Sequence, residues 1–64
     1  MINDRGVYWE VRAYNEALEL VGRVEFNNAE AARKAARGYS LADPFLSFKL
    51  WKMDPVHGAV EIMP

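Results

Sequence analysis

The best-placed residues for acid–base chemistry in this sequence are Asp54 and His57, which lie three positions apart in a turn-forming segment. A carboxylate beside an imidazole can orient the ring for general-base catalysis. Such catalysis also needs a second positioned group, and neither Ser40 nor Ser47 has a base paired with it in the sequence. The more ordinary interpretation is that Asp54 caps its own turn and His57 is exposed. We therefore expect no catalytic residues here.

Cofactor and metal chemistry have equally little support. The sequence contains no P-loop, nucleophile elbow or glycine-rich dinucleotide motif. It has no cysteine and a single histidine, and its carboxylates do not cluster at ligand spacing. A chain of 64 residues also has difficulty enclosing a ligand pocket unless subunits share it. We expect a non-enzymatic protein with no cofactor and no metal.

The composition is that of a folded globular protein, with 52% hydrophobic and 27% charged residues. A formal net charge of −1 gives no overall attraction to nucleic acids or to anionic membranes. No apolar run is long enough to span a bilayer, and residues 1–6 lack the layout of a secretory signal. These features predict a cytoplasmic protein without a membrane partner.

The length predicts one domain covering residues 1–64, with a flexible amino terminus at residues 1–6. A domain of this size is marginally stable, and small scaffolds usually gain stability from disulfides, a metal or oligomerisation. Without cysteine, two routes remain: a dense core or association with another chain.

Alternating apolar and polar residues predict four strands. Residues 7–14 and 18–26 form the first hairpin, joined by a loop at 15–17 in which Asn15 suits a positive φ. Leu18 and Leu20 fall on the apolar side of this pattern, as does Gly22, where a bulge is possible. Residues 45–53 and 59–63 form the second hairpin, around a turn at 54–58.

One short helix is predicted between the hairpins. Residues 29–37 are rich in alanine, with charged residues between. Asn27 or Asn28 can cap its start, and Gly38 is expected to end it in the left-handed conformation. The basic residues Arg33, Lys34 and Arg37 would then complement the dipole at its carboxyl end, which is a more ordinary role than phosphate binding.

The order ββαββ predicts an α+β fold, with a four-stranded antiparallel sheet in the order 2-1-3-4 and the helix packed on one face. The other face is left to water or to a partner. This face is expected to carry glutamates together with large apolar and basic side chains, Met63 among them. The predicted site residues on it are Tyr8, Arg12, Tyr14, Val21, Arg23, Lys49, Trp51 and Met53.

Three interpretations of this face stay open. Aromatic residues have high strand propensity and can simply cover their neighbours. Grouped aromatic and methionine residues also favour a contact surface, for a second copy or another protein. An interaction or accessory module that self-associates through this face or through an open sheet edge is the leading hypothesis for the function. Nucleic acid is the alternative, because the rings can stack on bases while the cations contact phosphates. The glutamates at positions 10, 19, 25 and 61 oppose it, since each repels the backbone that would be bound.

The segment Tyr8-Trp9-Glu10-Val11-Arg12-Ala13-Tyr14, followed by Val24-Glu25-Phe26, Glu30-Ala31 and Ala35, resembles the amino-terminal arm-type DNA-binding domain of tyrosine integrases. The resemblance covers roughly half of the chain and implies a small sheet, backed by a helix, that enters a DNA groove. This sequence lacks the strongly basic sheet of that family and adds a carboxyl-terminal hairpin, so membership is not inferred.

Overall fold

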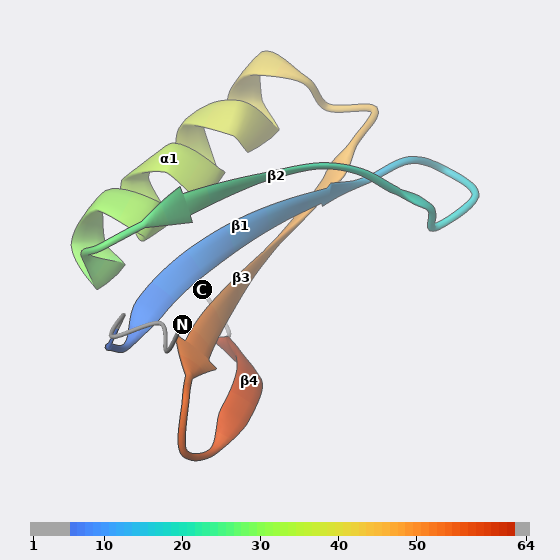
Figure 1. Cartoon of the computed structure of the whole chain (residues 1–64). Helices are drawn as coiled ribbons and strands as arrows, with labels where there is room; N and C mark the ends of the chain where they lie inside the picture. The colour runs from blue at the N-terminus through green and yellow to red at the C-terminus, as the bar shows by residue number, and fades with distance from the viewer. Residues whose placement is uncertain (1–5, 63–64) are drawn as a thin grey trace.

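The computed structural model describes residues 6–62, which form four strands and one helix in the order ββαββ (Figure 1). The elements are β1 (Tyr8–Tyr14), β2 (Leu20–Phe26), α1 (Ala29–Ala42), β3 (Ser47–Asp54) and β4 (Gly58–Ile62). The strands form one antiparallel sheet in the order β2-β1-β3-β4, with α1 on one face. The predicted fold class, element order and strand order are confirmed. The prediction of a flexible terminus at residues 1–6 lies outside the described residues except for Gly6, and so does the predicted position of Met63.

The loop between β1 and β2 is longer than predicted, because Leu18 adopts a left-handed conformation with φ of 63°. The prediction of positive φ at Asn15 is therefore wrong. Asn15 instead organises the loop as an acceptor: its Oδ1 accepts hydrogen bonds from the backbone N–H of Ala17 (2.9 Å) and of Glu19 (3.0 Å). Since a left-handed residue interrupts an extended strand, β2 begins at Leu20 rather than at Leu18.

A β-bulge interrupts the pairing of β1 with β2. Ala13 pairs with Gly22, but Tyr14 pairs with Leu20, so Val21 is an extra residue in β2. The sequence allowed a bulge at Gly22, and the structure has one directly beside it. The bulge also changes the face of Leu20, which was expected on the helix side and now lies opposite Tyr14.

Helix α1 is longer than its alanine-rich segment. Asn28 caps its start, where the side-chain Oδ1 accepts a hydrogen bond from the N–H of Ala31 at 3.0 Å. Gly38 lies inside the helix and does not end it; the end is at Asp43, whose N–H donates to the carbonyl of Tyr39. The Tyr39 ring packs 5.8 Å from the ring of Phe48, and this contact favours the additional turn.

The longer helix changes the position of its basic residues. Arg33, Lys34 and Arg37 lie in middle turns, and the last turn has no basic residue. Their predicted complementarity to the carboxyl end of the helix dipole is therefore wrong, because the dipole acts mainly within the terminal turns.

In the second hairpin, Asp54 and Gly58 shape the turn, and Gly58 has a φ of 82° that favours glycine. Strand β3 begins at Ser47, two residues later than the sequence predicts. Phe45 lies in the preceding loop and is 77% exposed.

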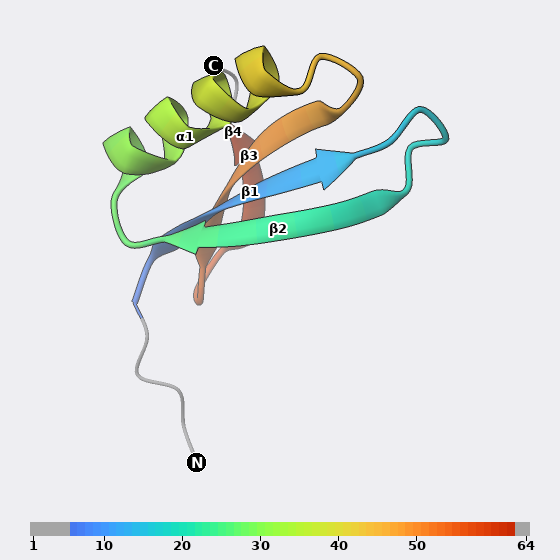
Figure 2. The same ribbon diagram turned by 90° about the horizontal axis from the view of Figure 1, so that it is seen from above.

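The core lies between α1 and the middle of the sheet, where Val11, Ala32 and Leu50 are buried. Ala32 is fully buried, because a methyl side chain lets the helix approach the strands closely. Helix α1 packs chiefly against β3 and β1 and less against β2. Figure 2 shows β2 at the outer edge of the sheet, away from the helix. The partly buried side chains around this core are Trp9, Phe26, Ala36, Phe48 and Ile62.

Candidate interaction surface

The strand register brings most of the predicted site residues together on the sheet face opposite α1, here called the open face. Directly opposed residues in an antiparallel pair share a face. On β1 and β3 the opposed pairs of this face are Tyr8 with Met53, Glu10 with Trp51, Arg12 with Lys49, and Tyr14 with Ser47.

The two predicted site residues on β2 are placed differently. Arg23 is opposite Arg12 and belongs to the open face. Val21 has no partner in the β1 register because it lies in the bulge, and it is 54% exposed. Seven of the eight predicted residues thus share one face, and Val21 lies at its border.

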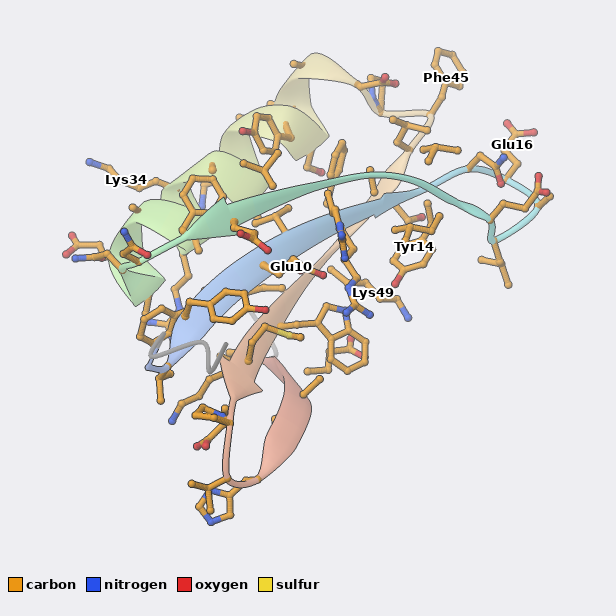
Figure 3. The ribbon with its side chains drawn as sticks, in the orientation of Figure 1. Glu10, Tyr14, Glu16, Lys34, Phe45 and Lys49 are labelled. Atoms are coloured by element: carbon orange, nitrogen blue, oxygen red, sulfur yellow. The ribbon has the colours of Figure 1, made fainter. Side chains whose placement is uncertain are left out.

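The aromatic rings of the open face are covered in part by cations. The Arg12 guanidinium lies 5.0 Å from the centre of the Trp51 ring, and the Lys49 ammonium lies 5.8 Å from that of Tyr14. Figure 3 shows Tyr14 and Lys49 on the same side of the sheet, and Lys34 projecting from α1 on the other. Cations over aromatic rings are attracted by the ring quadrupole. These rings are therefore half-buried rather than bare.

Glu10 is the central residue of the open face that sequence reasoning did not select. It is only 1% exposed, although no helix covers this face. Its carboxylate forms an ion pair with the Nε of Arg12, and a guanidinium nitrogen of Arg23 lies 3.9 Å from its other oxygen. The hydrogen bond to Glu10 raises the pKa of Arg12 above its usual value, against the opposing effect of burial. One signal in the sequence could have selected Glu10, namely its position in β1. Tyr8 and Arg12, two residues before and after it, lie on the same face of the strand.

The charges of β2 are opposed by like charges on β1. Arg23 lies opposite Arg12, and Glu25 lies opposite Glu10. Like charges directly opposite each other on a sheet are destabilising, and here the diagonal approach of Arg23 to Glu10 offsets part of that effect. Among residues 6–62, β2 pairs with β1 on one side and with no strand on the other side. The backbone groups on that other side therefore form an open edge of the sheet.

An open hollow of about 310 Å³ lies on the helix side, next to β2. Its lining includes Gly22, Val24, Tyr39 and Phe48. A second hollow of about 290 Å³ lies between α1 and the β3–β4 hairpin, and its lining includes Arg33, Arg37 and Glu61. The described residues contain no group of three or more potential metal ligands.

Asp54 and His57 form a turn cap. Asp54 Oδ1 accepts hydrogen bonds from the backbone N–H of Val56 (2.8 Å) and of His57 (3.2 Å), while Oδ2 lies 3.1 Å from His57 Nδ1. These bonds, that from Val56 above all, lower the pKa of Asp54 to about 2. The His57 side chain is 76% exposed. The expected capping role of Asp54 and the exposure of His57 are confirmed.

The fold and this surface define a small α+β domain with one sheet face covered by a helix and the other open. Comparison with known proteins finds no matching family model, no matching curated protein and no matching solved structure. No helix among residues 6–62 is both long and apolar enough to cross a membrane.

Proposed function

We propose that this protein is a small non-enzymatic interaction module that self-associates through its sheet. The observation that carries this proposal is the imbalance between buried and exposed apolar residues. Over residues 6–62, only Val11, Ala32 and Leu50 are buried apolar residues. The exposed large hydrophobic residues are Val7, Leu18, Leu20, Val21, Val24, Tyr39, Leu41, Phe45, Val56 and Val60.

Self-association supplies what the isolated chain lacks. Each square ångström of apolar surface removed from water contributes about 25 cal/mol, so an interface adds to the stabilisation that the small core provides. An assembly of this kind fits an accessory protein located in the cytoplasm. Composition predicts the same location. The absence of cysteine agrees with this location.

Sedimentation equilibrium over protein concentrations from about 1 µM to about 1 mM tests this proposal. We expect a mass above the 7.3 kDa of one chain, together with a Tm that rises with protein concentration. A mass of one chain throughout this range, with a Tm independent of concentration, would refute self-association.

Nucleic-acid binding remains the alternative, supported by the rings and cations on the open face. Its weakness is that Arg12 already contacts Glu10 and Trp51, while Lys49 lies over Tyr14. Titration with single-stranded oligonucleotides at low ionic strength tests it. Salt-sensitive binding that weakens on Lys49→Ala, or on Arg12→Ala once circular dichroism has verified that this variant is folded, would support nucleic acid as the ligand, and no binding would remove this alternative.

A further inference from the structure

The open edge of β2 carries a charge pattern that is complementary to itself. We propose that two copies of this chain pair antiparallel along β2, with Val24 of each copy at the two-fold axis. Each copy contributes four strands, so the sheet continues across the interface. This inference rests on the proposed self-association and specifies the surface and the register through which it occurs.

Pairing about Val24 places opposite charges across the interface. Arg23 of one copy lies opposite Glu25 of the second copy, and the same contact repeats on the other side of the axis. Opposite charges directly across an antiparallel pair are stabilising. In the β1 register the same two residues lie opposite like charges, Arg12 and Glu10, whereas across the interface each lies opposite an unlike charge.

Neighbouring registers lack this complementarity. A two-fold axis at Arg23 places two arginines opposite each other, and an axis at Glu25 does the same with two glutamates. The other sheet edge, β4, is shorter, and its single charged residue is Glu61. Its sequence therefore offers no opposite charge for antiparallel pairing with itself.

The helix side of the interface also fits a second copy. The same register places Gly22 opposite Phe26 of the second copy and the two Val24 side chains next to each other. Val24 is 43% exposed in the single chain, and a Cβ at Gly22 would meet no atom within 4 Å. A ring across from a strand glycine covers the backbone that the glycine leaves exposed. Because Phe26 packs against the core of its own copy, the glycine opposite it leaves room for the two strands to approach each other.

Charge exchange tests the register directly. Arg23→Glu leaves acidic side chains at positions 23 and 25, and Glu25→Arg leaves basic side chains at both. We expect each variant alone to have its dimer dissociation constant raised about tenfold or more. The double variant Arg23→Glu/Glu25→Arg restores dimerisation, and so does an equimolar mixture of the two single variants, because each mixed pair has opposite charges. Glu61→Arg, the same change on β4, is the control and leaves the constant unchanged.

A cysteine scan gives a second test that does not depend on charge. Directly opposed strand residues have Cα atoms about 4.5–5.5 Å apart, within disulfide range. Because the chain has no cysteine, Val24→Cys is expected to form a covalent dimer under mild oxidation. Val60→Cys, at the middle of β4, is the matched control and is expected to crosslink far more slowly.

The outcomes separate this inference from the proposed function. A dimer that is insensitive to both charge exchanges and is crosslinked no faster by Val24→Cys than by Val60→Cys would overturn the β2 register while self-association stands. A single-chain mass at every concentration would overturn both. Arg23→Glu removes the contact with Glu10, and Glu25 also has an interaction within its own chain, so circular dichroism verifies the folding of each variant. If either charge variant unfolds, Val24→Cys still tests the register.

Discussion

Glu10 and Arg12 form an ion pair on the one sheet face that no helix covers, and Glu10 is nevertheless almost completely buried. The burial comes from neighbouring side chains of the sheet itself, since Arg12 contacts both the carboxylate and the Trp51 ring. A carboxylate in this position depends on its cation, because a buried charge without a partner is costly.

Removing that cation tests the arrangement. Arg12→Ala is expected to lower the free energy of unfolding by about 2–4 kcal/mol, because it leaves Glu10 buried with only the more distant Arg23. Lys49→Ala, opposite Arg12 in the register, is the matched control and is expected to cost less than about 1 kcal/mol. Urea denaturation measures both changes. Equal losses for the two variants would contradict a supporting role of Arg12 for Glu10.

The cap of α1 can be assigned by two adjacent substitutions. Asn28→Ala is expected to destabilise the protein by about 1 kcal/mol, because the N–H of Ala31 loses its acceptor. Asn27→Ala serves as the comparison and is expected to have a clearly smaller effect. Thermal unfolding followed by circular dichroism distinguishes them, and a larger loss for Asn27→Ala would assign the cap to that residue instead.

Gly38 offers a test of where α1 ends. Gly38→Ala is expected to stabilise the protein by about 0.5–1 kcal/mol, because alanine has the higher helix propensity and its Cβ would meet no atom within 4 Å. Were Gly38 a left-handed cap, the same change would be destabilising. Denaturant unfolding at a fixed protein concentration gives the sign, and a loss of stability would indicate a shorter helix.

The turn carboxylate gives a pH dependence with a defined direction. Because the pKa of Asp54 falls from 3.8 to about 2 on folding, the stability that its ionised form contributes is present above pH 4 and is lost as the pH falls toward 2. An NMR titration of the carboxyl carbon is expected to show this low midpoint. In Asp54→Asn the corresponding loss of stability is absent. A midpoint near 3.8 would show that the turn bonds do not persist in solution.

Local sequence patterns were sufficient for the fold. Alternation in residues 7–14 and 45–53 and the alanines of residues 29–37 predicted the elements, and the element order predicted which strands pair. Both signals work because strand and helix periods are properties of short segments. The same alternation placed Arg12, Lys49 and Trp51 on one face.

Tertiary contacts decided the rest. Helix α1 continues past Gly38, where Tyr39 packs against Phe48 from a strand later in the chain. The bulge at Val21 depends on how β2 pairs with β1, and it changed the face of Leu20. The burial of Glu10 needs Trp51, about forty positions away, so periodicity within either strand cannot reveal it. The sequence alone thus determined which elements form, in which order, and the face on which most of their residues lie. Only packing between distant segments decided where those elements end and which charged residue is buried.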